Sequence, residues 1–323
     1  MWHGINVSLL ETGSVSDSHA HYDRLERVVG RYEDVSDQSI QQITVGREEN
    51  MQSDLNRVMG KAVANFINPK DWLRDSVTEM MERCDKNPKV YITLGCHPGM
   101  ANQWKPSYVP ELSKAIANLD SVVAIGECGL DGTLVNGSRN VPRVSWEKQI
   151  EAFKAQVYLA RVMELPLVIH LREAEEEGRN YLERIIEPNH KIHRHCFMGT
   201  LQDYEAWIEK FPNTYWSFTA WVTQDGYLTD DQKTMIKRIP SERLLVETDA
   251  PYFVPKGLRP QNSFSRPIHA LIVAKALADI RDQSLHQLLS STMSNLLSLY
   301  DPDGLFSIID IPSSSTSSSS LSD

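Results

Sequence analysis

Short apolar, β-branched runs alternate with longer helical patterns along most of the chain. Side chains on a strand repeat every two residues and those on a helix about every 3.6, so the two patterns can be told apart. Eight runs predict strands, the first ending at His19 and the others at 61–67, 90–95, 121–126, 166–170, 192–196, 214–219 and 243–248. Helical periodicity fills the intervals, at 71–84, 111–119, 146–163, 181–186, 204–211, 229–239, 267–280 and 284–300.

Eight strands that alternate with helices over roughly 250 residues or slightly more are typical of a (β/α)8 TIM barrel, an α/β fold. We expect the barrel to span residues 15–305, with an inserted polar loop at about 24–56 that holds up to one short helix. Residues 1–14 are expected to form a short leader. The tail 306–323 is rich in serine and is expected to be disordered.

Ionisable residues follow the predicted strands at their carboxyl ends, where barrel enzymes carry their active sites. The strand ends carry His19, His21, Glu127, His170, His195, Glu247 and Asp249. His19 and His21 are two positions apart, so on a strand they face the same way. Four histidines and at least two carboxylates on one rim suit divalent cations such as Zn²⁺ or Mn²⁺. Six ligands are too many for one tetrahedral site and suit two ions bridged by a carboxylate.

Five further residues are candidates for roles around this cluster. Arg172 shares a face with the histidine of the fifth strand and could bind a phosphate, or else pair with a neighbouring glutamate. His97 follows the third strand at the same rim, where it is a candidate for contact with substrate or a simple turn residue. Asp17, Glu247 and His193 are expected to support the ligands from behind, His193 mainly as a core residue.

Composition narrows the possible functions. The chain has 33 basic and 43 acidic residues, a net charge of −10. The net charge of the protein therefore does not attract nucleic acid, and a polyanionic substrate needs cations in the site or a local basic patch.

The four cysteines are scattered without a Cys-x-x-Cys pair, which favours a reducing compartment over a disulfide framework. Without a secretory signal or an apolar run of roughly 20 residues, we expect an intracellular protein, cytoplasmic or nuclear, that does not act at membranes. The sequence indicates no protein partner.

Six ordered blocks resemble the signature blocks of the TatD family of metal-dependent nucleases. They are DSHAHYD at 17–23, LGCHP at 94–98, IGECGLD at 125–131, LPLVIHLREA at 165–174, HCFMG at 195–199 and VETDAPYF at 246–253. The resemblance covers about residues 17–300. It implies an amidohydrolase-like TIM barrel with 3′-to-5′ exonuclease activity on single-stranded DNA and, in some members, activity on RNA.

The resemblance also implies a set of ligands for two divalent ions, Mg²⁺, Mn²⁺ or Zn²⁺. His19, His21 and Asp249 would bind one ion, His170 and His195 the second, and Glu127 would bridge the two. Asp249 and Glu127 are the implied catalytic residues. Asp249 would accept the proton of the attacking water or orient that water.

Two other functional classes stay open. One is a metal-dependent ester or amide hydrolase of the amidohydrolase type. Glu127 stands where that group often carries a carboxylated lysine, which favours the nuclease. The other is a non-catalytic barrel that binds nucleic acid or protein, which the complete ligand set disfavours. Gly99, Gly132 and residues 264–267 depart from the family pattern, so substrate placement and strand polarity stay open.

Overall fold

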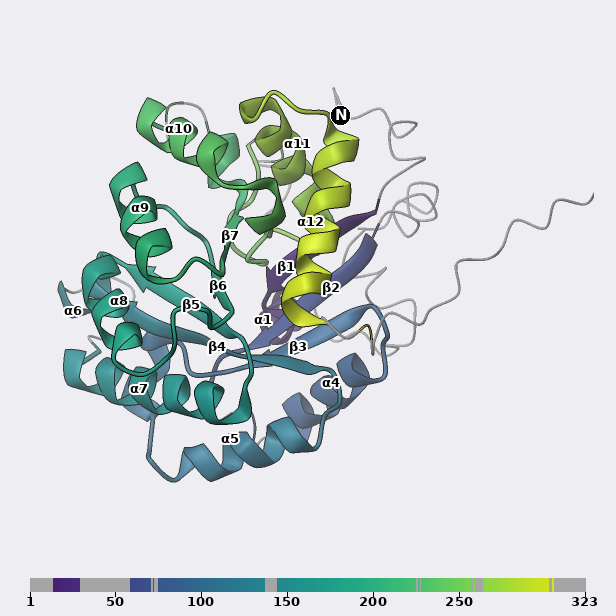
Figure 1. Ribbon diagram of the computed structural model, residues 1–323. Coiled ribbons are helices and arrows are strands. Elements are labelled where there is room, and N and C mark those ends of the chain that lie inside the picture. The colour runs from purple at the N-terminus through teal and green to yellow at the C-terminus, as the bar shows by residue number, and fades with distance from the viewer. Residues whose placement is uncertain are drawn as a thin grey trace, which may run out of the picture.

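Eight parallel strands form a nearly closed barrel, and helices connect successive strands along the chain (Figure 1). The computed structural model describes residues 14–29, 59–70, 72, 75–136, 144–224, 226, 228–256, 258, 264–301 and 304. The strands are β1 (Val15–Ala20), β2 (Met59–Phe66), β3 (Val90–Leu94), β4 (Val122–Asp131), β5 (Leu167–Arg172), β6 (Ile192–Arg194), β7 (Thr214–Phe218) and β8 (Leu244–Val246). All eight predicted strands are present in the predicted order, which confirms the TIM barrel.

The helices form the outer layer of the barrel (Figure 1). The α-helices are α1 (Tyr22–Val29), α4 (Asp75–Asp85), α5 (Tyr108–Ala117), α6 (Gly132–Asn136), α7 (Trp146–Met163), α8 (Glu175–Glu183), α9 (Leu201–Lys210), α10 (Asp230–Arg238), α11 (Ala270–Ile280) and α12 (Leu285–Tyr300). Short 3₁₀ helices are η3 (Pro98–Gln103), η4 (Ala220–Thr223), η5 (Ser241–Arg243) and η6 (Pro267–His269). Reciprocal side-chain caps at Thr200, Thr229 and Ser284 fix where α9, α10 and α12 begin.

One helix starts well before its predicted boundary. The pattern predicted a helix at 181–186, but α8 begins at Glu175 and ends at Glu183. Three glutamates occupy its first turn, where the helix dipole favours negative charge, and Gly178 obscured the helical pattern. A Cβ at Gly178 would lie 2.4 Å from the Leu171 side chain, so the glycine lets α8 pack closely on β5.

The predicted segments at the chain ends lie almost wholly outside the described residues. Of the predicted leader, the structure describes residue 14 alone, and it describes none of the tail 306–323. At the predicted insert, residues 24–29 belong to α1, which matches the short helix expected there, and 30–56 lie outside the described residues. The domain boundaries therefore stay predictions.

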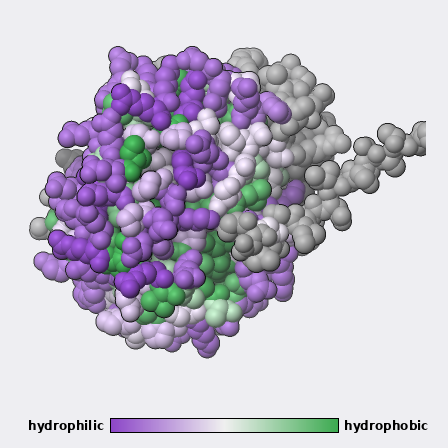
Figure 2. Space-filling view, in the orientation of Figure 1, coloured by the Kyte–Doolittle hydropathy of each residue, from purple (hydrophilic) through white to green (hydrophobic). Residues whose placement is uncertain are grey.

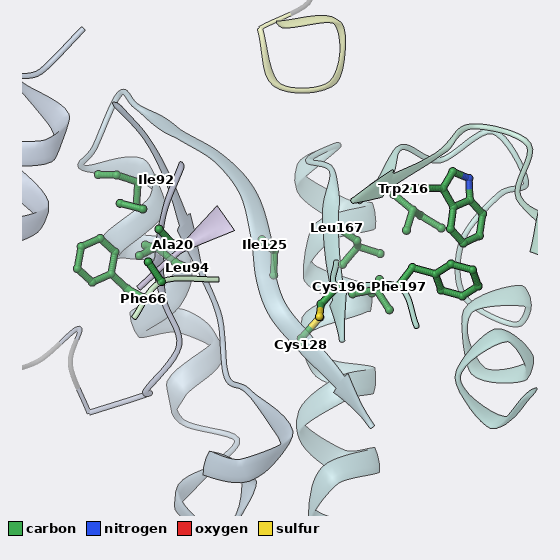
Figure 3. Packing of buried hydrophobic residues seen from close by; sticks show 14 of the residues in the cluster. Ala20, Phe66, Ile92, Leu94, Ile125, Cys128, Leu167, Cys196, Phe197 and Trp216 are labelled. Atoms are coloured by element: carbon green, nitrogen blue, oxygen red, sulfur yellow. The ribbon is translucent and has the colours of Figure 1, made fainter. Parts of the chain in front are cut away.

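The hydrophobic core has two layers. The outer layer lies between strands and helices, where Phe66, Ile92 and Leu94 pack together on one side and Phe197 and Trp216 on another (Figure 3). The rings of the last pair are 4.6 Å apart. Over the face drawn in Figure 2 the described surface is mostly hydrophilic, as expected for a barrel whose apolar side chains are turned inward.

The inner layer fills the amino-terminal half of the barrel. Its members are Val63, Tyr91, Val123, Ala124, Val168, Tyr215 and Leu245 from the strands, with Leu296, Leu299 and Tyr300 from α12. Helix α12 therefore closes the barrel at the amino ends of the strands. The opposite end, at the carboxyl ends, is left for polar side chains.

A register shift in β4 changes which way its later residues point. Ile125 pairs with Leu167 and Cys128 with Ile169, so three steps along β4 match two along β5. Ile125 and Cys128 both belong to the outer hydrophobic layer. Simple alternation would put Glu127 on the same side as Ile125, facing the helices. The extra residue instead turns the Glu127 side chain into the barrel.

Candidate metal centre

The seam between β1 and β8 brings together three of the predicted ligands. An isolated bridge joins Ala20 to Ala250, the His21 amide donates to the Ala250 carbonyl (2.8 Å), and the Asp249 amide donates to the His19 carbonyl (2.9 Å). Asp249 Oδ1 lies 3.0 Å from His21 Nε2 and 3.8 Å from His19 Nε2. The same seam that closes the barrel therefore assembles this side of the site.

Glu127 stands at the middle of the cluster with its two oxygens facing opposite sides. Oε2 lies 3.4 Å from His19 Nε2 and 3.6 Å from His21 Nε2. Oε1 lies 2.6 Å from His170 Nδ1 and 3.3 Å from His195 Nε2. The four predicted histidine ligands thus converge on the Glu127 carboxylate, and Asp249 joins them through His19 and His21.

These residues fit a divalent cation. Several of their polar atoms are buried without a hydrogen-bond partner, namely both ring nitrogens of His19, His21 Nδ1, Glu127 Oε2, His170 Nε2 and Asp249 Oδ1. Such orphaned atoms are costly unless a ligand satisfies them. The nearest donor atoms of His19, His21 and Glu127 all lie within 4.8 Å of one another, as do those of His97, Glu127 and His170. Imidazole and carboxylate groups at this spacing are the donors that divalent metals accept.

The electrostatics of the site favour positive charge. Burial opposes ionisation of Glu127, but the surrounding imidazoles, His195 first, hold the pKa of its carboxyl well below the usual range. Burial likewise opposes protonation of His19, yet its contact with the Glu127 carboxylate raises the pKa of the imidazole to about 9. A buried site that stabilises a protonated imidazole will also attract a metal cation.

Glu247 lies directly behind His195. It receives hydrogen bonds from the Cys196 amide (2.7 Å) and the Ser217 hydroxyl (2.6 Å), and it lies 3.1 Å from His195 Nδ1. Burial opposes ionisation of Glu247, but His195 and the hydrogen bonds of His193 and His195 hold the pKa of its carboxyl well below the usual range. The charged carboxylate fixes the His195 ring with Nε2 directed at the centre of the site.

The other two supporting residues lie deeper. His193 is fully buried between the Ser217 hydroxyl and the Tyr300 hydroxyl, each 2.7 Å from one of its ring nitrogens. Asp17 accepts hydrogen bonds from the amide (2.9 Å) and the hydroxyl (2.5 Å) of Thr248. Asp17 therefore ties β1 to the residue before Asp249.

His97 and Arg172, the predicted substrate contacts, flank the centre. His97 Nε2 lies 3.6 Å from Glu127 Oε1, and its ring meets that of His170 edge-on with centroids 4.5 Å apart. Arg172 is half-buried and lines a pocket of about 590 Å³ beside the centre. The other lining residues are Leu171, Glu173, Ala174, Glu175, Glu176, Glu177, Cys196, Met198, Gly199, Thr200 and Asp203. Arg172 is thus the one cationic residue in an acidic lining.

Sequence reasoning missed a buried arginine that organises two ligand-bearing strands. Arg194 is 1% exposed and donates to the carbonyls of Ile169 (3.3 Å), Leu171 (2.6 Å) and His195 (2.5 Å), and to Glu175. Arg194 holds the carboxyl ends of β5 and β6 together, next to His170 and His195. The available signal was an arginine between two histidines in a predicted strand, which by itself does not say which way the side chain points.

Histidines and carboxylates clustered at the carboxyl ends of barrel strands are an arrangement typical of metal-dependent hydrolases. The chain belongs to the TatD family, because the family model described as TatD related DNase matches residues 16–301. In the described part of the chain, no helix combines the length and the apolar character that a membrane crossing needs.

Two curated relatives show the range of the similarity. The human 3'-5' RNA nuclease TATDN2 is 31% identical over 293 residues, which are 90% of this chain but only 35% of the human protein. The 3'-5' ssDNA/RNA exonuclease TatD of Salmonella typhimurium is 32% identical over 216 residues, 66% of this chain and 79% of the bacterial protein.

Solved structures support the fold. YJJV, a TatD homolog from Escherichia coli k12, superposes with a TM-score of 0.69 at 22% identity, covering 88% of this chain and 97% of that one. An uncharacterized amidohydrolase from Saccharomyces cerevisiae gives a TM-score of 0.70 at 19% identity, covering 89% of this chain and 100% of that one. At these identities the likeness concerns the fold alone.

Proposed function

We propose that the protein is a metal-dependent nuclease that hydrolyses phosphodiester bonds of single-stranded nucleic acid, DNA or RNA, from the 3′ end. The observation that carries the proposal is the convergence of four buried histidines on Glu127 with Asp249 beside them, where several ligand atoms have no hydrogen-bond partner. The direction and the substrates are those in the names of the human and bacterial relatives. The chain spans about a third of the human relative, so these details come by analogy.

The proposed centre would take two ions of Mg²⁺, Mn²⁺ or Zn²⁺. His19, His21 and Asp249 would hold the first ion, His170 and His195 the second, and Glu127 would contribute to both. The division is supported by the opposite directions of the two Glu127 oxygens. Bound there, such ions would supply Lewis acidity toward the phosphate and lower the pKa of the attacking water.

Asp249 is the residue proposed to take the proton of that water. Its side chain is 11% exposed, whereas that of Glu127 is 2% exposed, so Asp249 is the carboxylate nearer to the mouth of the site. A group at the mouth can pass a proton to solvent. Glu127 stays ionised and buried between the two groups of histidines, where it fixes their separation.

His97 and Arg172 are proposed to bind the substrate phosphate. His97 Nδ1 accepts a hydrogen bond from the Gly99 amide (2.9 Å), so the proton of a neutral ring sits on Nε2. His97 then presents an N–H donor to the site, which suits a phosphate oxygen better than a metal. Arg172 offers a guanidinium fork from the other strand end. Arg172 supplies local positive charge, and His97 a neutral N–H donor, in a chain whose net charge is −10.

The test is cleavage of end-labelled single-stranded DNA and RNA with Mg²⁺, Mn²⁺ or EDTA. Wild-type protein is compared with the double variant Glu127→Ala, Asp249→Ala. A matched control, Glu205→Ala with Asp230→Ala, removes two exposed carboxylates from α9 and α10 and changes the net charge equally. We expect cleavage that needs metal, persists in the control and disappears in the double variant, with a ladder that shortens from the 3′ end.

Two results would contradict the proposal. If metal-loaded wild-type protein cleaves neither DNA nor RNA but hydrolyses esters or amides, the alternative amidohydrolase activity replaces it. If the protein binds nucleic acid and the double variant changes no turnover, the barrel is a binding module.

A further inference from the structure

An arginine and a tyrosine lie beside the metal centre, outside the ligand set and the phosphate contacts already described. Arg24 is on α1, three residues after His21, and Tyr252 follows β8, where its amide donates to the Asp249 carbonyl (2.9 Å). Arg24 Nη1 donates to the Tyr252 hydroxyl (2.8 Å), and the guanidinium lies 5.9 Å from the centroid of the tyrosine ring. The two side chains form a pair across the seam.

The Tyr252 ring stands at the edge of the site with much of its surface open. Its edge meets the ring of His21, with centroids 5.9 Å apart and an interplanar angle of 75°. The residue is 44% exposed, whereas the aromatic residues Trp104 and Trp221, in the loops after β3 and β7, are 3% and 4% exposed. A large ring that is held in place and yet exposed is a surface on which a base can stack.

The Arg24 guanidinium keeps hydrogen-bonding capacity beyond the tyrosine. Its Nε is buried and has no hydrogen-bond partner in the structure. Its charge interacts with the carboxylates of Asp23 and Glu127, so it lies within reach of the centre. An arginine has five N–H donors in a planar fork that matches a phosphate. Arg24 flanks the side of the centre with His21 and Asp249, and Arg172 flanks the side with His170.

We propose that Arg24 and Tyr252 form the subsite for the nucleotide next to the scissile bond, with Arg24 on its phosphate and Tyr252 stacked on its base. This inference rests on the proposed nuclease function. A phosphate and a base at adjacent positions are what one nucleotide offers to a guanidinium and a neighbouring aromatic ring. Bases inside a duplex are stacked on both faces, whereas a base of a single strand can unstack and offer a face to the ring, so the subsite favours single strands. The nucleic-acid strand then runs across the mouth of the site from Arg24 toward Arg172.

The test is steady-state cleavage of a single-stranded oligonucleotide at several salt concentrations. Arg24→Gln should raise KM about tenfold, as expected for a lost charge-assisted hydrogen bond, with a much smaller change in kcat. It should also reduce the slope of log KM against log salt by about 0.7, because one phosphate contact is lost. Arg24→Lys should keep that slope, and Tyr252→Leu should raise KM about tenfold while Tyr252→Phe retains the stacking.

Arg238→Gln is the matched control. Arg238 is exposed on α10 in an ion pair with Glu205, so its loss removes the same charge away from the site, and KM and the salt slope should stay at the wild-type values. Metal content and melting temperature show that each variant is folded with its centre intact. If wild-type protein cleaves the oligonucleotide and Arg24→Gln matches it in KM and in salt slope, the subsite is refuted and the nuclease function stands. If wild-type protein cleaves nothing, the nuclease function itself is refuted.

Discussion

Replacement of Glu247 by glutamine tests whether the residue behind His195 sets metal affinity. Three donors converge on the carboxylate, the Cys196 amide, the Ser217 hydroxyl and His195 Nδ1. Glutamine has nearly the same shape, but it has one acceptor oxygen and an amide nitrogen that can only donate. At least one of the three donors must then face another donor in a fully buried position.

The size of the effect follows from these contacts. Loss of a hydrogen bond to a buried charged group costs about 1.5–3 kcal/mol. Because one of the donors is the ring of His195, part of this cost falls on the orientation of that ring. Loss of such a partner behind a metal-binding histidine weakens metal affinity by about 10- to 100-fold. We therefore expect the Kd for Mn²⁺ or Zn²⁺ at the site that includes His195 to rise by that factor in Glu247→Gln.

The assay is calorimetric titration of metal-free protein, repeated in competition with a chelator. Asp85→Asn is the matched control, since Asp85 accepts from the Ser121 amide and hydroxyl (both 2.7 Å) at the amino end of β4, away from the site. It should lower the urea midpoint of unfolding and leave metal affinity at the wild-type value. Wild-type affinity in Glu247→Gln, or an equal loss in both variants, would refute the reasoning.

Three further predictions concern stability, each followed by urea unfolding. Gly129→Ala places a Cβ 1.7 Å from the His170 carbonyl oxygen and should lower the free energy of unfolding by more than about 4 kcal/mol. A variant with wild-type stability would contradict this contact. Thr248→Val removes the hydroxyl bonded to Asp17 and should cost about 1–3 kcal/mol, whereas Thr248→Ser should cost much less; equal losses would be inconsistent with the bond. Burial lowers the pKa of His269 to about 3, so the unfolded chain takes up the proton first as pH falls below 6.5. By about pH 4.5 the wild type should lose about 3 kcal/mol of unfolding free energy that His269→Gln does not lose, and parallel pH profiles would exclude this source.

The fold could be predicted because the barrel strands carry continuous apolar runs. A run buried on both sides is visible without knowledge of its neighbours, which is why strands such as β3, β4 and β5 were found. His170, which directly follows such a run, was placed at the rim for the same reason. The start of α8 was missed because local propensity at Gly178 did not reveal its close packing on Leu171.

The site contains two features that a single sequence does not reveal. Glu127 reaches the centre through a register shift between β4 and β5, and a shift depends on pairing with another strand rather than on the residues themselves. Arg194 is buried because three carbonyls and Glu175 surround it, and these groups come from other segments of the fold. Both features are tertiary, so periodicity alone could not predict them.

The seam between β1 and β8 has a consequence for the order in which the protein is made. Asp17 and Thr248, which clasp the seam, are 231 positions apart in the chain. Strands β1 to β7 can pair in turn as they leave the ribosome, each with the strand before it. His19 and His21, among the earliest residues of the barrel, must wait for Asp249 until β8 has emerged. A chain interrupted before β8 therefore carries five of the six ligands and no complete centre, so catalytic competence arrives only with the closing strand.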